Sequence, residues 1–212
     1  MAIAYVYDGT LYLAITRRCT LACTFCPKVH GRWVVAGNDM SHDQEPSAAE
    51  ALAAAHALMP QVPAKKAAFV GLGEPTMRLD VLCAVGRQLR ADGFHVRVVT
   101  DGLANLRAGH DVTPQLEGAV DEVSVSLNAP DGDTYVKVCP NRYGAAAHAA
   151  VCDFIGAVKP HVPSVLASVV TAPGVDVEAT QALARKLGVP LRVRPYFDPR
   201  LGEPHEQPAG PR

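Results

Sequence analysis

The sequence has no strong excess of charge of either sign, and it has no long apolar run. Its 212 residues carry 20 Lys and Arg against 21 Asp and Glu, which gives a formal net charge of −1. A general nucleic-acid-binding protein normally shows a marked basic excess, so this class is not favoured. A membrane-spanning helix needs roughly 18 or more apolar residues in a row, and a secretory signal needs a basic region followed by an apolar stretch. Neither pattern is present, so we expect a cytoplasmic protein without a membrane partner.

The cysteines are not spread along the chain as they are in a small disulfide-linked secreted domain. Three of the six, Cys19, Cys23 and Cys26, lie within eight residues of one another. The other three are Cys83, Cys139 and Cys152, which show no close pairing. We therefore expect one cysteine-built metal site, and core positions for the scattered cysteines.

Short apolar segments alternate with longer helical patterns along the chain. Strands are predicted at residues 11–16, 67–70, 96–100, 122–127, 165–170 and 191–194. Helices are predicted at about 47–59, 79–91, 112–118, 144–158 and 176–187, the first of them with a capping box formed by Ser47 and Glu50. Such alternation predicts parallel strands joined by right-handed crossovers. The expected fold is α/β, a partial (β/α)6 TIM-like barrel of parallel strands with outer helices; a doubly wound open sheet is the alternative.

The domain organisation follows from the same pattern. Residues 1–197 are expected to form one domain, and residues 198–212, rich in proline and glycine, to form a flexible tail. A polar stretch at 28–46 is expected to cover part of the open side of the barrel. In either candidate fold the chemistry lies at the carboxyl ends of the strands.

The cysteine spacing, C-x3-C-x2-C directly after the first predicted strand, almost demands a metal. Three cysteines could hold a [4Fe–4S] cluster with one iron left open, or His30 could complete a closed zinc site. The segment Gly71-Leu72-Gly73-Glu74-Pro75 after the second predicted strand favours the cluster. Its glycines let backbone groups approach a ligand, and Glu74 can accept hydrogen bonds from an ammonium group.

The segment Cys19-Thr20-Leu21-Ala22-Cys23-Thr24-Phe25-Cys26 resembles the signature loop of radical S-adenosylmethionine (radical SAM) enzymes. Gly-Leu-Gly-Glu-Pro-Thr at 71–76 resembles the methionine-binding motif of that superfamily. The chain is most similar to a small subgroup, the TatD-associated radical SAM proteins. The stretches that carry this similarity are 11–26, 71–79, 98–105, 120–135 and 189–196.

The resemblance implies roles for individual residues. Cys19, Cys23 and Cys26 would ligate the cluster, and the open iron would chelate the amino and carboxylate groups of S-adenosylmethionine (SAM). Gly71, Gly73 and Glu74 would contact the methionine part of SAM. Phe25 would lie near the adenine, and Ser126 and Asn128 near the ribose hydroxyls. Thr100 and Asp101 would support the methionine or ribose, although many relatives have Asn at the position of Asp101. Arg194 would pair with the SAM carboxylate or with an anion of the substrate.

The implied reaction is reductive cleavage of SAM to a 5′-deoxyadenosyl radical, which abstracts hydrogen from a substrate. A flavodoxin- or ferredoxin-type donor would supply the electron. The substrate is either a protein or peptide or a small molecule, and the residues that contact it are not identified. Cys139 could relay a radical or serve a structural role. The alternatives are a catalytically silent redox sensor that binds cluster and SAM, and a Cys3His zinc-binding module.

Overall fold

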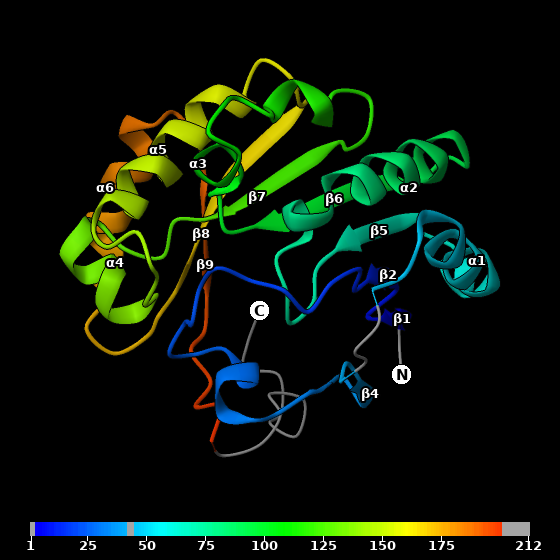
Figure 1. Ribbon diagram of the computed structural model, residues 1–212, viewed down its shortest axis with the longest axis horizontal. Helices are drawn as coiled ribbons and strands as arrows, with labels where there is room; N and C mark the ends of the chain where they lie inside the picture. The colour runs from blue at the N-terminus through cyan, green and yellow to red at the C-terminus, as the bar shows by residue number, and fades with distance from the viewer. Residues whose placement is uncertain (1–2, 42–44, 201–212) are drawn as a thin grey trace.

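The computed structural model describes residues 3–41 and 45–200. Its main feature is a seven-stranded sheet in the order β1-β2-β5-β6-β7-β8-β9, shown in Figure 1. The strands are β1 (Ala4–Tyr7), β2 (Thr10–Leu13), β5 (Lys66–Phe69), β6 (His95–Thr100), β7 (Glu122–Ser126), β8 (Ser164–Val170) and β9 (Leu191–Arg194). From β2 onward all neighbours are parallel and follow chain order, and β1 does not pair with β9. The sheet is therefore an open, partial barrel, and the doubly wound alternative is not adopted.

The strand β1, which pairs antiparallel with β2, is not among the predicted strands. The two strands are joined by Asp8 and Gly9, both with positive φ (45° and 66°), and Tyr7 lies opposite Thr10. This is the geometry of a two-residue hairpin turn, in which Asp-Gly is a favoured pair.

Four predicted helices are confirmed: α1 (Ala48–Leu58), α2 (Leu79–Ala91), α5 (Ala146–Val158) and α6 (Val177–Lys186). The capping box of Ser47 and Glu50 is present at the start of α1. The helix predicted at 112–118 is wrong, because only a 3-10 turn forms there, at Thr113–Leu116. Gly118 follows with a φ of 70°, which ends the helical path. Two short helices were not predicted, α3 (Ala104–Ala108) and α4 (Gly132–Val138).

The polar stretch after the cysteines has structure of its own. It begins with a 3-10 turn at Pro27–His30 and continues into a small hairpin of β3 (Val34–Val35) and β4 (Asn38–Asp39). Met40, only 1% exposed, packs with Tyr5, Ala14 and Leu72 in a second, smaller apolar cluster. The stretch therefore covers the β1–β2 side of the barrel. Further 3-10 turns lie at Met59–Gln61 and Pro75–Arg78.

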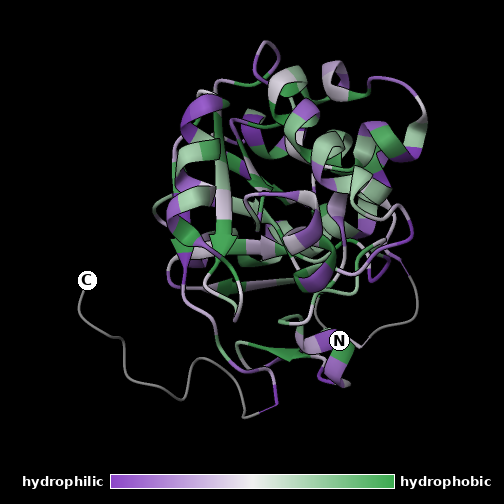
Figure 2. Ribbon diagram, turned by 90° about the vertical axis from the view of Figure 1, so that its left-hand side faces the viewer, coloured by the Kyte–Doolittle hydropathy of each residue, from purple (hydrophilic) through white to green (hydrophobic). Residues whose placement is uncertain are grey.

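The main core lies between the helices and one face of the sheet. Phe69, Val96, Val98 and Val123 are fully buried in it, and the helices lie along this face in Figure 1. Figure 2 shows hydrophobic strands inside and helices with alternating hydrophobic and hydrophilic residues outside. The opposite face of the strands, which we call the inner face, carries the alternate residues of each strand.

Among the described residues, no helix combines the length and apolarity needed to cross a bilayer. Residues 201–212 of the predicted tail lie outside the part of the chain that is described. The boundary at residue 197 and the flexibility of the tail therefore stay predictions.

Candidate functional site

The predicted site residues lie on loops that follow parallel strands, so they meet at one end of the sheet. Hydrogen bonds join these loops directly. The Glu74 amide donates to the carbonyl of Arg18 at 2.8 Å, and the Thr20 hydroxyl donates to Asp101 Oδ2 at 3.1 Å. The loops after β2, β5 and β6 thus form one connected structure.

The cysteine loop is held in place by the segment that follows α4. The Ala22 amide donates to the Pro140 carbonyl at 2.8 Å, and the Thr24 amide donates to the Val138 carbonyl at 2.9 Å. Phe25 packs against the main core. These contacts shape the loop without using any of the three thiols.

The three predicted metal ligands are half-buried, and none is in a disulfide. Burial raises the pKa of the Cys19 thiol to about 12 and raises that of the Cys26 thiol. The pKa of Cys23 is also raised, first by its contact with Cys139 and then by burial. Thiolates are the form that binds metal, so the positive charge of a metal centre would have to stabilise them. Three thiols on one partly buried loop fit this requirement.

A fourth thiol lies beside them. The Sγ atoms of Cys23 and Cys139 are 3.4 Å apart, and the side-chain amide of Asn128 donates to Cys139 Sγ at 3.5 Å. Cys139 is completely buried at the end of α4. The structure thus places Cys139 against one of the predicted ligands.

His30 is the residue that the zinc alternative requires. Its ring is exposed, and Nε2 lies 2.8 Å from the carbonyl oxygen of Thr24 in its own loop. Within residues 3–41 and 45–200, no three His, Cys, Asp or Glu side chains converge on one point as for a single metal ion. A cubane cluster binds its cysteines through separate irons, so it does not require that convergence.

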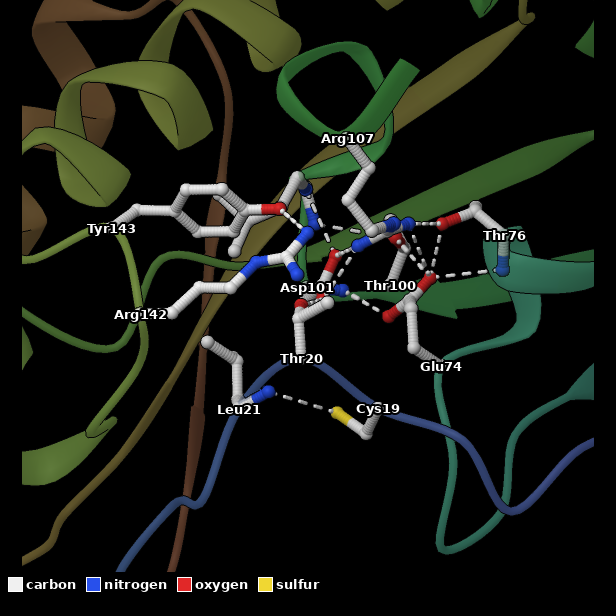
Figure 3. Close-up of polar contacts among 12 residues, drawn as sticks. Cys19, Thr20, Leu21, Glu74, Thr76, Thr100, Asp101, Arg107, Arg142 and Tyr143 are labelled. Atoms are coloured by element: carbon white, nitrogen blue, oxygen red, sulfur yellow. Dashed lines mark hydrogen bonds and ion pairs between the residues drawn. The ribbon is translucent and has the colours of Figure 1, made fainter.

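Glu74 is the centre of a buried hydrogen-bond network, shown in Figure 3. Its side chain is 3% exposed, and Oε1 accepts hydrogen bonds from Thr76 and from the Thr100 hydroxyl, the latter at 2.7 Å. Oε2 accepts from the Asp101 amide at 2.6 Å. The carboxylate of Glu74 therefore joins the loop after β5 to the loop after β6. Burial, together with the charge of Asp101, raises its pKa to about 7.

Asp101 is paired with Arg107, a residue of α3 that the sequence analysis missed. Arg107 Nη1 lies 3.0 Å and 2.9 Å from the two carboxylate oxygens of Asp101, and Nη2 donates to the Thr76 hydroxyl. The Arg107 side chain is 11% exposed and that of Asp101 is 4% exposed. Arg107 thus neutralises a pair of buried carboxylates, Asp101 and Glu74, next to the cysteine loop. Figure 3 shows the guanidinium between them.

The pH dependence of folding tests this network in the cofactor-free protein. Unfolded Glu74 releases its proton near its ordinary pKa of 4.5, whereas folded Glu74 holds it until about pH 7. Between these values the folded state binds more protons than the unfolded state, so stability falls as pH rises. Denaturant unfolding of Glu74→Gln across pH 4.5–7 should show a smaller decrease than the wild type. Equal slopes for the two proteins would contradict the raised pKa.

Gly71 and Gly73 allow the loop after β5 to pack tightly against the end of β2. A Cβ on Gly73 would lie 2.1 Å from the carbonyl oxygen of Thr16, and one on Gly71 would lie 2.9 Å from the Cβ of Ala14. Both glycines are therefore needed for packing between the two loops, whether or not a ligand also approaches them.

Replacing Gly73 with alanine should destabilise the protein by about 1–3 kcal/mol or more, because the backbone of residue 16 must move. Gly156 provides the matched control. It is exposed within α5, and a Cβ there meets nothing within 4 Å. Gly156→Ala should stabilise the helix by roughly 0.5–1 kcal/mol. Thermal unfolding of both variants checks the prediction, and equal effects would contradict the packing argument.

The remaining predicted residues lie at the ends of β7 and β9. Ser126 is half-buried, whereas Asn128 is 2% exposed and has a left-handed φ of 56°. Asn128 Oδ1 is buried without a hydrogen-bond partner among the described residues. Arg194 is half-buried, and burial lowers its pKa, with the charge of Arg192 adding to the effect. These groups are available to a ligand, whereas Glu74, Thr100 and Asp101 already bond to one another.

Residues 13–187 match the family model of the radical SAM superfamily. The chain belongs to the radical SAM superfamily. Radical SAM proteins normally use a [4Fe–4S] cluster and SAM, and the match includes all three cysteines of the loop and both glycines after β5. This membership decides against the zinc-binding module as the class of the protein.

Individual relatives show how far the similarity extends. A GTP 3′,8-cyclase from Corynebacterium glutamicum (strain R) is 28% identical over 134 residues, 60% of this chain and 33% of the relative. The chain thus matches only a third of the length of that relative. A structure of TYW1 with a lysine-pyruvate adduct bound has a TM-score of 0.62 at 17% identity, covering 92% of this chain and 67% of that one.

A radical SAM methyltransferase from Sphaerobacter thermophilus has a TM-score of 0.54 at 18% identity, with 93% of this chain and 70% of that chain covered. For methylornithine synthase (PylB) the TM-score is 0.54 at 15% identity, with 89% and 53% covered. At these identities the structural matches show the fold, a TIM-barrel-like parallel sheet.

Proposed function

We propose that this radical SAM protein binds one [4Fe–4S] cluster through Cys19, Cys23 and Cys26 and cleaves SAM reductively to act on a separate substrate. One observation carries the proposal: three half-buried thiols, none in a disulfide, lie on a loop joined by hydrogen bonds to the strand ends. When bound, such a cluster supplies the electron that splits SAM into methionine and the 5′-deoxyadenosyl radical.

The chain's own residues would bind SAM and fix its orientation. Asn128 Oδ1 is buried and has no partner among the described residues, so it can accept a hydrogen bond from a ribose hydroxyl. Ser126, at the end of the same strand, offers a second polar group. Phe25 would lie near the adenine.

The methionine part of SAM would lie along residues 71–74. Gly71 and Gly73 would contact it through their backbone groups, while the space that a side chain would occupy is filled by Ala14 and Thr16. Glu74, Thr100 and Asp101 would act mainly by holding the loops in position, since their side chains are already hydrogen-bonded to one another. Arg194 offers its guanidinium to a carboxylate, from SAM or from the substrate.

The electron donor and the position of the chain within the superfamily are also part of the proposal. A flavodoxin- or ferredoxin-type protein would supply the electron, because the chain's other three cysteines are scattered and form no second ligand set. Within the superfamily, the TatD-associated subgroup is the proposed position of this chain, on the segments that carry the similarity.

Anaerobic reconstitution with iron and sulfide, followed by a SAM cleavage assay under reducing conditions, tests this function. We expect about four irons per chain and formation of 5′-deoxyadenosine. Iron and SAM binding without any cleavage would favour the redox sensor instead. A colourless protein with one zinc and no iron would overturn the proposal.

A further inference from the structure

The inner face of the sheet is unusually rich in arginine. Val96 and Val98 are buried against the helices, so Arg97 between them belongs to the inner face. On β9, Arg192 and Arg194 share a face because they are two residues apart, and Arg192 lies in register with Ser168 of β8. Burial lowers the pKa of Arg194, and the positive charges of Arg192 and, to a smaller extent, Arg97 add to this effect.

These cations are poorly compensated by the protein. Arg97 has one carboxylate nearby, with Nη1 3.8 Å from Glu122 Oε1. Within the described part of the chain, the side chains of Arg192 and Arg194 form no hydrogen bond or ion pair, although the Arg194 carbonyl accepts from the Thr171 amide. Like charges near one another repel, so an anion among half-buried Arg97, half-buried Arg194 and exposed Arg192 would be stabilised.

Buried polar atoms on the same face also lack partners. Ser168 is 1% exposed, and its hydroxyl has no hydrogen-bond partner among the described residues. The Nε atoms of Arg97 and Arg194 are also buried and also lack a hydrogen-bond partner among the described residues. Buried polar groups are nearly always hydrogen-bonded, and an unpaired one costs free energy. These three unpaired atoms lie on the same inner face, which indicates that a bound molecule supplies their hydrogen-bond partners.

A hollow of about 290 Å³ opens on this face near the amino ends of the strands. Its lining includes the cations Lys66, Arg97 and Arg192 and the carboxylates of Asp8 and Glu122. A strand rises about 3.3 Å per residue, so the four residues from Arg97 to Asp101 span roughly 13 Å. A molecule held at Arg97 would need about this length to reach the strand ends where the cysteines lie.

We propose that the inner face binds an elongated small-molecule substrate whose carboxylate or phosphate group lies between Arg97 and Arg192, with its other end toward the cysteine loop. Ser168 and Arg194 would contact the middle of the molecule. This inference rests on the proposed function, because it gives the chemical class of the substrate for that site. Carboxylate and phosphate groups share the negatively charged oxygens that arginine binds, and the experiment below distinguishes the two groups.

The test is isothermal titration of the reconstituted full-length protein, at low ionic strength, with inorganic phosphate in one arm and succinate in the other. We expect the wild type to bind at least one of the two, and the stronger arm identifies the kind of oxyanion. Arg97→Gln and Arg192→Gln should each weaken that binding at least tenfold. The Arg192 side chain is exposed and forms no hydrogen bond or ion pair with the described residues, so its variant keeps the test valid if Arg97→Gln folds poorly.

Arg87→Gln is the matched control, because Arg87 is exposed on α2 and, among the described residues, its side chain donates to the Gln115 carbonyl alone. This variant should bind like the wild type. The inference is overturned if the wild type binds neither probe, if Arg192→Gln binds unchanged, or if Arg87→Gln loses as much affinity. Cleavage of SAM by the wild type is measured separately without any probe. Cleavage without anion binding would overturn this inference alone, and arginine-dependent anion binding without cleavage would overturn the proposed function alone.

Discussion

Replacing Arg107 with alanine is expected to destabilise the folded protein by about 3–5 kcal/mol, because it leaves buried carboxylates without their counter-charge. Arg107 binds both oxygens of Asp101 and donates to Thr76, and its Nη2 lies 4.0 Å from Glu74 Oε1. Without the guanidinium, Asp101 and Glu74 would repel each other in a region of low dielectric. Denaturant unfolding at pH 7.5 measures the loss.

Two controls separate charge from other effects of the substitution. Arg87→Ala removes an exposed arginine and should change stability by less than about 0.5 kcal/mol. Arg107→Lys keeps the charge but loses the bidentate contact with Asp101, so its stability should lie between those of the wild type and Arg107→Ala. The effect of Arg107→Ala should also decrease at low pH, where Glu74 is protonated. A loss of less than about 1 kcal/mol at pH 7.5 would show that Arg107 does not stabilise the buried carboxylates to this extent.

Replacing Cys23 with serine is expected to reduce bound iron and 5′-deoxyadenosine formation to background levels. Without the Cys23 thiolate, one iron of the cluster loses its protein ligand, and serine is a poor substitute for thiolate at iron. Iron analysis, the visible absorption of the cluster and the SAM cleavage assay, all under anaerobic conditions, measure the outcome.

The matched controls are the other cysteines. Cys152→Ser changes a half-buried thiol of α5 and should retain both iron and cleavage. Cys139→Ser is the sharper control, because its sulfur lies only 3.4 Å from that of Cys23. It should retain iron if Cys19, Cys23 and Cys26 are the ligands. Loss of iron in Cys139→Ser with retention in Cys23→Ser would exchange the roles of these two residues.

Much of the fold could be predicted because its signals are local. The six parallel strands alternate with helices, and Ser47 with Glu50 marks the start of α1. The strand ends could be aligned without coordinates, since parallel strands bring their carboxyl ends together. The β1 strand was not predicted, although the Asp8-Gly9 pair between it and β2 is a hairpin signal.

The rest depends on contacts between distant segments. Arg107 lies on a five-residue helix, and nothing local shows that its side chain reaches Asp101. The contact of Cys139 with Cys23 joins segments 116 residues apart. Gly73 was interpreted as a site of ligand approach, whereas its nearest neighbour is Thr16. Arg97 and Ser168 could have been found, because each is a polar residue flanked by apolar residues within its strand.

The outer strand β9 has a consequence for the solution behaviour of the protein. An unpaired strand edge invites other chains to add to it, which leads to aggregation. β9 has only four residues, lies between Pro190 and Pro195, and carries two arginines. Proline offers no amide hydrogen, and neighbouring positive charges repel a second copy. Variants that neutralise Arg192 or Arg194 therefore also remove charges that oppose self-association, and they are best compared at low protein concentration.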